Sequence, residues 1–263
     1  MSRAAVPVLM YHGLGVPGPR AEAHYTFSEE SFARQLRQIQ EQGRVVSLET
    51  LLEGRAGPGD VVLTFDDGED SVTRVALPMM RELGMVGTLF VTTAWIGTEG
   101  FVGEDDLRAL RDAGWSMGTH GVTHRYLSDL SDMQVREELV QSRDTMTRIL
   151  GEPPVHMSLP GGRRESRRVV KAVRAAGYGS LCTSTVGVNE SPPNPFGVRR
   201  TMMIQPFDDP RTLERILAPD PLFYLKLRTR QEVLEVAKLA MGNPRYERLR
   251  GLAFGAMRRL RRS

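Results

Sequence analysis

Two adjacent carboxylates follow an apolar run in the first third of the chain. Residues 61–65 read Val-Val-Leu-Thr-Phe, a pattern typical of a buried strand, and Asp66-Asp67-Gly68 comes directly after it. Adjacent side chains leave an extended backbone in opposite directions. One carboxylate can therefore bind a cation while the other stays free to move protons. The alternative interpretation is that Asp-Asp-Gly forms only a turn.

A second segment offers two imidazoles. Residues 120–124 read His-Gly-Val-Thr-His, so that His120 and His124 stand four positions apart. This spacing brings both rings to one ion on a helical or tight-loop backbone, and neutral imidazole suits zinc and similar divalent ions. The same spacing also occurs by chance on surface helices. We expect a metal site because Asp66 and Asp67 fall on the same predicted rim.

One aspartate and two histidines would form a catalytic metal site rather than a structural one. Such a set leaves coordination positions open for water and for a substrate oxygen. A divalent ion can lower the pKa of its bound water from 15.7 to about 7, and a second carboxylate nearby can take the proton. The residue types therefore favour hydrolysis of an acyl group.

The segments around these motifs predict a parallel α/β fold. Short apolar runs rich in β-branched residues alternate with segments of helical period. The expected strands are Val6–Tyr11, Val45–Ser47, Val61–Phe65, Thr88–Thr93, Trp115–Thr119, Val155–Leu159, Gly179–Thr183 and a weaker Val198–Ile204. In such folds the loops after the carboxyl ends of the strands form the binding face. His12, directly after the first strand, joins the carboxylates and the histidine pair on that rim.

Three helices are marked by their ends. One begins after Ser28, a good N-cap residue, and ends at Gly43. A second covers Asp105–Ala113 and closes at a glycine in the same way. The third, Ser131–Leu150, carries apolar residues at helical spacing and cannot continue through Pro153-Pro154.

The composition is that of an ordinary globular protein. The chain has 263 residues, of which 40% are hydrophobic and 25% charged, with a single cysteine, which excludes disordered, collagen-like and disulfide-rich classes. No apolar stretch reaches the roughly 20 residues that span a bilayer. The first ten residues lack the features of a secretory signal. Because Cys182 also has no partner for an intramolecular disulfide, we expect a cytoplasmic location.

Charge is distributed unevenly along the chain. Residues 211–263 hold 13 Lys and Arg against five Asp and Glu. Basic and apolar residues alternate from Leu222 to Ser263, which is compatible with a solvated helical extension packed on the body. The alternative is peripheral contact with anionic lipid headgroups at the inner face of a membrane. No nucleic-acid partner is expected, because the basic tail lacks interleaved aromatic residues.

Residues 64–68 and 120–124 resemble the first two motifs of the polysaccharide deacetylases, carbohydrate esterase family 4, which carry the NodB-homology domain. The resemblance covers about residues 5–205. It implies a distorted, incomplete (β/α) barrel and metal-dependent removal of acyl groups, mostly N-acetyl, from sugars. It also implies roles for single residues: Asp66 as catalytic base, and Asp67, His120 and His124 as metal ligands. The opening residues 8–13 resemble the strand that begins many members.

Residues 158–162 resemble the third family motif, Arg-x-Pro-x-Gly, with Ser158 where the family often has an arginine. The resemblance implies further site residues, namely Gly161 as a backbone oxyanion donor and Pro160, Gly162 and Arg163 as substrate-binding residues. The arginine that would hold the base ionised and oriented is missing from its usual place. Arg163 or Arg164 would have to reach back to replace it.

Two later motifs of the family are not recognisable. No Asp-x-x-x-Trp pattern occurs around residues 178–186, and no histidine follows Val198, so the general acid is unassigned. His12 is the remaining histidine on the predicted rim. It either protonates the departing amine or packs the mouth of the barrel. Gly121 departs from the serine or threonine usual in the family at its position.

The main hypothesis is a hydrolase with a divalent ion, most plausibly Zn²⁺, that removes an N-acetyl or another acyl group from a sugar. Its substrate would be an acetylated polysaccharide, oligosaccharide or lipid-linked saccharide of a glycan or glycolipid pathway. The alternative is a non-catalytic carbohydrate-binding domain that keeps the deacetylase fold. We expect a catalytic domain over residues 5–205 and a basic, mostly helical extension over residues 206–263.

Overall fold

The computed structural model describes residues 4–18, 23–162 and 166–241. Its strands are β1 (Val6–Tyr11), β2 (Arg44–Val45), β3 (Asp60–Phe65), β4 (Thr88–Val91), β5 (Ser116–Thr119), β6 (His156–Ser158), β7 (Ser180–Cys182), β8 (Val188–Asn189) and β9 (Thr201–Met202). Its α-helices are α1 (Glu29–Gln42), α2 (Leu48–Leu52), α3 (Leu77–Glu82), α4 (Glu104–Asp112), α5 (Asp132–Leu150), α6 (Arg167–Ala175), α7 (Pro210–Leu217) and α8 (Pro221–Met241). Short turns of 3-10 or π type lie at Val72–Ala76, Thr93–Trp95, Leu127–Asp129, Pro160–Gly162 and Gln205–Phe207.

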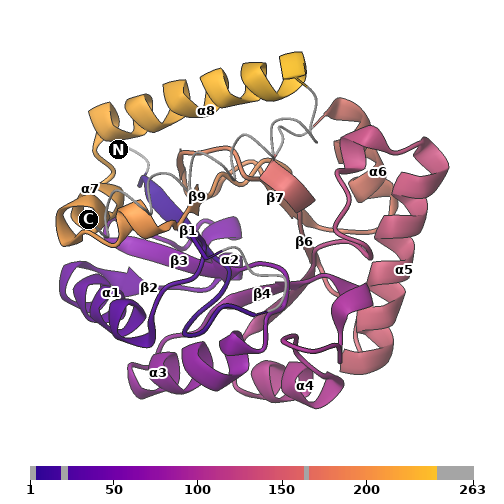
Figure 1. Cartoon of the computed structure of the whole chain (residues 1–263), viewed down its shortest axis with the longest axis horizontal. Helices are drawn as coiled ribbons and strands as arrows, with labels where there is room; N and C mark the ends of the chain where they lie inside the picture. The colour runs from indigo at the N-terminus through magenta and orange to yellow at the C-terminus, as the bar shows by residue number, and fades with distance from the viewer. Residues whose placement is uncertain (1–3, 19–22, 163–165, 242–263) are drawn as a thin grey trace.

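The strands form one curved sheet with helices on its outside (Figure 1). The order along the sheet is β7-β6-β5-β4-β3-β1-β8, with β2 also paired to β3 and β9 to β1. Pairs from β7 to β1 are parallel, and β8 alone among the described strands is antiparallel to its partner. The expected parallel α/β fold, a distorted and incomplete barrel, is confirmed.

The gap between the two ends of the parallel run is spanned by residues 198–202. Val198 makes an isolated parallel bridge to Cys182 of β7, and three residues later Thr201 and Met202 pair with β1. The strand expected at Val198–Ile204 is therefore much shorter, because its two ends pair with different neighbours. The side chain between these pairings, Arg200, is fully buried.

Local signals explain the helix ends. The Ser28 side chain accepts a hydrogen bond from the Ser31 amide at the start of α1, and α5 begins at a capped serine and ends at Gly151, whose φ is 83°. Gly43 ends α1, as expected. Its φ of −171° is an extended conformation that any residue can adopt, so the backbone conformation does not explain the glycine. A Cβ at this position would lie 2.1 Å from the carbonyl oxygen of Gly59, so close backbone approach requires the glycine.

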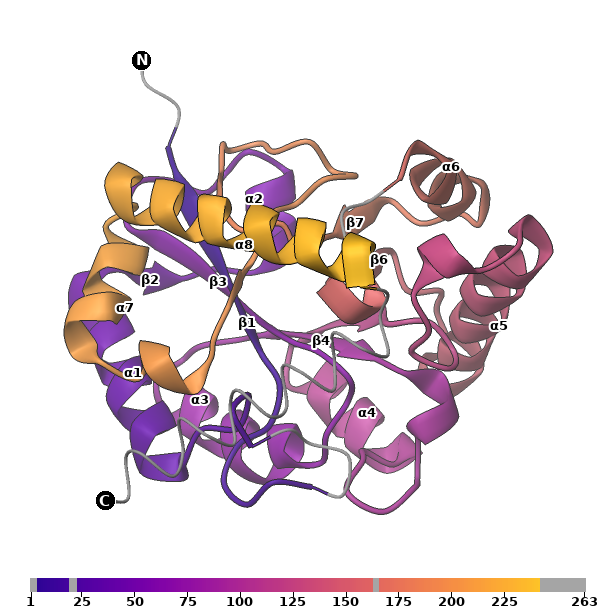
Figure 2. The same cartoon turned by 45° about the horizontal axis from the view of Figure 1, so that its top comes forward.

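The C-terminal helices pack on the barrel. Leu213 and Ile216 of α7 and Phe223 and Tyr224 of α8 join the same hydrophobic cluster as the β1 and β3 side chains. Helix α8 lies along the side of the molecule where β9 and the loop after β7 are found (Figure 2). Within the described residues no helix is long and apolar enough to cross a membrane. Residues 242–263 of the expected extension lie outside the described residues.

Candidate functional site

The two carboxylates after β3 point to different partners. Asp66 is buried and faces Arg200, whereas Asp67 faces the two histidines. Asp67 has a φ of 74° and Gly68 a φ of 89°, so the chain leaves the extended conformation directly after Asp66. The turn, together with the alternation of the strand, separates the two carboxylates. Both interpretations of Asp-Asp-Gly thus apply, since the residues form a turn and also carry the site.

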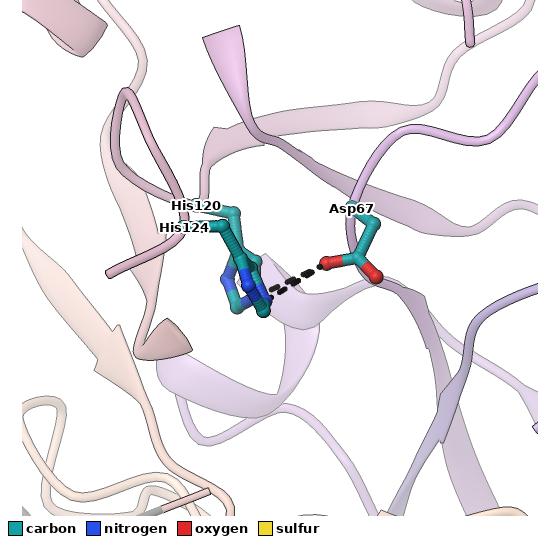
Figure 3. A group of neighbouring side chains, drawn as sticks. All are labelled: Asp67, His120 and His124. Carbon is teal, nitrogen blue, oxygen red and sulfur yellow. Dashed lines mark ion pairs between the residues drawn. The ribbon is translucent and has the colours of Figure 1, made fainter. Parts of the chain in front are cut away.

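Three ligand atoms converge at this rim (Figure 3). The Oδ1 atom of Asp67 lies 3.3 Å from Nε2 of His124 and 3.5 Å from Nε2 of His120. One ligand atom from each of the three residues lies within 4.8 Å of the others. Oδ1 of Asp67 is buried, and none of the described residues donates a well-aligned hydrogen bond to it, although it lies within ion-pair distance of both imidazoles. A buried carboxylate oxygen left without a well-aligned donor and facing two imidazole nitrogens fits a divalent cation.

The protonation state of His120 also fits a metal ligand. Its Nδ1 lies 3.1 Å from the carbonyl oxygen of Ser158 and also contacts the Ser158 hydroxyl. A carbonyl oxygen can only accept, so Nδ1 carries the proton and Nε2 keeps its lone pair. Burial lowers the pKa of His120 to about 4, and the ring is therefore neutral at neutral pH. Ser158 thus orients a metal-ligand candidate at the position where the family often has an arginine.

The two histidines lie on a tight loop, not on a helix. Gly121 has a φ of 77° and His124 a φ of 60°, and both conformations are left-handed. The end of β4 holds the loop, because the Thr93 amide donates to the Gly121 carbonyl at 3.1 Å and the Ala94 amide to the Val122 carbonyl at 3.0 Å. A left-handed histidine is costly without such support. These hydrogen bonds thus hold the loop in its left-handed conformation.

Glu138 of α5 gives the loop its strongest support. Its buried carboxylate accepts hydrogen bonds from the Val122 amide at 2.6 Å, the Thr123 amide at 3.0 Å and the Thr123 hydroxyl. A Cβ on Gly121 would lie 2.9 Å from Oε2 of Glu138, which explains why glycine fits there. Our sequence reasoning missed Glu138. Its position next to Leu139, on the buried side of an amphipathic helix, is the signal that marks it.

Arg200 supplies the arginine that the sequence analysis found missing. Its Nη1 and Nη2 donate to the two carboxylate oxygens of Asp66 at 2.6 and 2.8 Å. Its Nε donates to the Thr183 carbonyl at 3.0 Å, and Nη1 also reaches the Thr64 hydroxyl at 3.3 Å. The expectation that the base lacks an arginine was wrong, because residues 198–202 bring one in from the other side of the barrel. Arg163 and Arg164 lie outside the described residues.

The charges around Asp66 favour its ionised form. Burial alone would raise the pKa of Asp66, but the Arg200 guanidinium outweighs it and holds this pKa below its usual value. Oδ2 of Asp66 lies 3.8 Å from Nε2 of His120. An ionised carboxylate, held on both oxygens, therefore stands directly beside the three candidate metal ligands.

His12 lies at the same rim. Its ring stacks on Tyr25, with the centroids 5.1 Å apart, and its Nδ1 is buried without a hydrogen-bond partner in the part of the chain that the structure describes. His12 lies close enough to Asp66 and Asp67 to interact electrostatically with both carboxylates. His12 therefore lies at the site, where it could act as the general acid. Its stacking on Tyr25 is also what we expect of a histidine that only packs the mouth of the barrel.

The turn at Pro160–Gly162 closes the site on another side. Gly161 has a φ of 81°, and a Cβ there would lie 2.1 Å from the Tyr126 ring, so no other residue fits. The ring of Pro160 lies against the Gly121 loop. Gly161, Pro160 and Gly162 therefore lie beside the candidate metal ligands. Arg163 falls outside the described residues.

Comparison with known proteins agrees with this arrangement. The polysaccharide deacetylase family model matches residues 53–181, which include both carboxylates, both histidines and the Pro160 turn. This part of the chain is similar to the polysaccharide deacetylases. The family match ends before residue 200, so the arginine that pairs with Asp66 lies outside it.

Two relatives and one solved structure illustrate the family likeness. The "Putative polysaccharide deacetylase YxkH" of Bacillus subtilis (strain 168) is 25% identical over 190 residues, which cover 70% of this chain and 66% of that protein. A chitin deacetylase of Colletotrichum lindemuthianum is 30% identical over 104 residues, or 39% of this chain and 42% of that protein. The chain thus spans less than two thirds of the length of these curated relatives. The Streptococcus pyogenes deacetylase PplD in complex with acetate shares the fold, with 22% identity, a TM-score of 0.73, and coverage of 82% of this chain and 99% of that chain.

The hydrogen bonds of Glu138 predict a loss of metal affinity on substitution. In Glu138→Ala the Val122 and Thr123 amides lose their acceptor, so the loop loses its fixed shape. We expect affinity for Zn²⁺ to fall about 10–100-fold, as for other residues that orient metal ligands, measured by isothermal titration calorimetry. Glu137→Ala, at an exposed neighbour on the same helix, is the matched control and should bind as the wild type does. Equal affinity in both variants would contradict a positioning role.

Proposed function

We propose that this protein is a metal-dependent deacetylase that removes an N-acetyl group from a sugar. The observation that carries this proposal is that a candidate metal site and a candidate general base lie side by side at one rim of the barrel. The metal site is the convergent set of Asp67, His120 and His124. The base is the ionised, buried carboxylate of Asp66, held by Arg200. The similarity of residues 53–181 to the polysaccharide deacetylases supports the reaction class.

Asp67 through Oδ1 and His120 and His124 through Nε2 would hold the divalent ion. The buried Oδ1 without a well-aligned donor and the bare Nε2 of His120 support this assignment. Two nitrogens and one oxygen suit Zn²⁺, and three protein ligands leave open positions. When bound, such an ion activates water and polarises the acyl oxygen.

Asp66 is our candidate for the general base. Its pKa below the usual value keeps the carboxylate ready to accept a proton at neutral pH. Arg200 holds both of its oxygens, which leaves their remaining lone pairs in a fixed direction beside His120. Arg200 is thus a positioning residue for the base.

Protonation of the departing amine and stabilisation of the oxyanion need further groups. We assign the first task to His12, whose buried Nδ1 has no hydrogen-bond partner among the described residues. We assign the second to the backbone amide of Gly161, in a turn that only glycine can form beside Tyr126. Pro160 and Gly162 flank this turn and would contact the sugar, together with Arg163.

The names of the relatives indicate which substrate to test first. Two relatives are named chitin deacetylases, one from Colletotrichum lindemuthianum and one from a Pestalotiopsis species, which makes N-acetylglucosamine oligomers the first probe. A lipid-linked acetylated saccharide is the second probe. The rival hypothesis of a non-catalytic sugar-binding domain rested partly on a missing arginine, and the contacts of Arg200 remove that ground. Its other ground, the unassigned late histidine, is tested through His12.

The proposed roles of the metal ligands and the base predict opposite phenotypes. The wild type with Zn²⁺ should release acetate from N-acetylglucosamine oligomers, and a chelator should stop this. His124→Ala should lose stoichiometric metal, whereas Asp66→Asn should keep the metal while turnover falls roughly 10²–10⁴-fold. Acetate release and metal content by elemental analysis check both. Sugar binding without acetate release by the metal-loaded wild type would favour the binding-domain alternative, and full activity of Asp66→Asn would exclude it as the base.

The contact between Arg200 and Asp66 predicts that a substitution of Arg200 lowers turnover without affecting substrate or metal binding. Arg200→Lys keeps the buried charge but loses the two-pronged contact with Asp66, so the base loses its fixed direction. We expect kcat to fall roughly 10²-fold, the size of effect that a misplacement of about 1 Å produces, with KM and metal content unchanged. The exposed neighbour Arg199→Lys is the control. A variant that only loses thermal stability, with kcat per folded molecule unchanged, would show that Arg200 serves folding alone.

If His12 protonates the leaving group, its substitution should lower turnover without changing the metal content. His12→Gln should lower turnover by roughly 10²–10⁴-fold while metal content stays intact, because a general acid contributes this much. Steady-state kinetics and elemental analysis measure the two quantities. If His12 only packs against Tyr25, the variant will melt at a lower temperature and keep its rate per folded molecule. In that case the proton must come from water or from Asp66.

A further inference from the structure

Helix α8 has one face that is firmly seated on the barrel. Phe223 and Tyr224 are buried in the main hydrophobic cluster. The Gln231 side chain bridges to the loop after β7, since its Oε1 accepts from the Val186 amide at 2.9 Å and its Nε2 donates to the Ser184 carbonyl at 2.7 Å. These contacts fix the rotation of the helix about its axis. Its opposite face is therefore defined.

That opposite face is apolar at its centre. Leu222, Leu225 and Val233 are 75%, 60% and 63% exposed, and their spacing of three and eight residues places them on one side of the helix. Of the seven large hydrophobic side chains that are exposed in the described part of the chain, four lie on α8. Thr229 lies within this stripe, Lys226 and Arg230 border it on one side and Glu232 borders it on the other, and all four are exposed. We call Leu222, Leu225, Lys226, Arg230 and Val233 together the outer face of α8.

A helix that packs one apolar face on its own protein ordinarily presents a polar face to water. The outer face of α8 departs from this pattern, because three exposed aliphatic side chains lie on it, with two cations along one border. The charge of the sequence that follows has the same sign, because residues 242–263 contain seven arginines and one glutamate. Aliphatic side chains with adjacent Lys and Arg match the interface of an anionic bilayer, where the apolar groups enter the acyl boundary and the cations meet headgroups.

Other occupants fit this surface less well. Two copies of the chain joined through their outer faces would bring Lys226 and Arg230 of each copy against like charges. A nucleic acid would use the cations and leave three aliphatic side chains in water. We propose that the outer face of α8 docks on anionic lipid, with the helix axis parallel to the membrane surface. This proposal does not depend on the reaction catalysed at the rim.

The test is sedimentation of the full-length chain with lipid vesicles. We expect binding to vesicles of phosphatidylglycerol and phosphatidylcholine and little binding to phosphatidylcholine alone. Lys226→Gln with Arg230→Gln should weaken binding to the anionic vesicles about 25-fold, since each cation near the surface contributes about fivefold. Leu222→Ser with Leu225→Ser and Val233→Ser should weaken it at least about tenfold. Met133→Ser, an exposed apolar residue on α5, is the matched control and should bind as the wild type does.

Three outcomes would overturn the proposal. The first is a wild type that does not bind the anionic vesicles. The second is binding that both α8 variants retain in full, which would place the contact in residues 242–263 or elsewhere. The third is a wild-type dimer, detected by light scattering without lipid, that the serine variant abolishes, which would assign the outer face to a second copy. Acetate release from a soluble oligomer, measured on each variant, should not change and keeps this test separate from that of the proposed function.

Discussion

The buried ion pair between Arg200 and Asp66 is the interaction on which the rest of the site depends. A carboxylate at the end of β3, fully enclosed, would be destabilising by several kcal/mol if it stood alone. Its partner comes from residues 198–202, the segment that bridges β7 and β1. The segment that bridges β7 and β1 therefore also supplies the cation that keeps the proposed base ionised. With Val198 paired to β7 and Thr201 to β1, the side chain of Arg200 lies against Asp66.

The neighbouring loop of the two histidines depends on a second buried carboxylate. Glu138 satisfies two backbone amides and one hydroxyl in a segment with left-handed residues at Gly121 and His124. A strained backbone of this kind persists only where surrounding contacts over-determine it. The loop thereby places the Nε2 atoms of His120 and His124 opposite Oδ1 of Asp67, so that one cation could contact all three atoms.

The tasks of the third family motif are divided between two parts of this chain. Ser158, at the place usual for arginine, bonds to His120 and fixes the nitrogen that faces Asp67. Arg200, 42 positions later, takes the partner role toward Asp66. The physical requirement is a cation beside a buried carboxylate, and any segment that reaches the same point in space can meet it. The departure from the motif is thus a relocation of the charge within the barrel.

Local patterns by themselves determined most strands, the ends of α1 and α5, and the residues of the proposed metal site. These depend on apolar runs, on caps such as Ser28, and on two short motifs at strand ends, all contained within a few residues. Only the tertiary structure decided that Arg200 meets Asp66, 134 positions away, and that Glu138 holds the histidine loop. The strand expected at 198–204 was shortened for the same reason. Such contacts arise from the way a sheet curves and closes, and no periodicity within a single segment encodes that geometry.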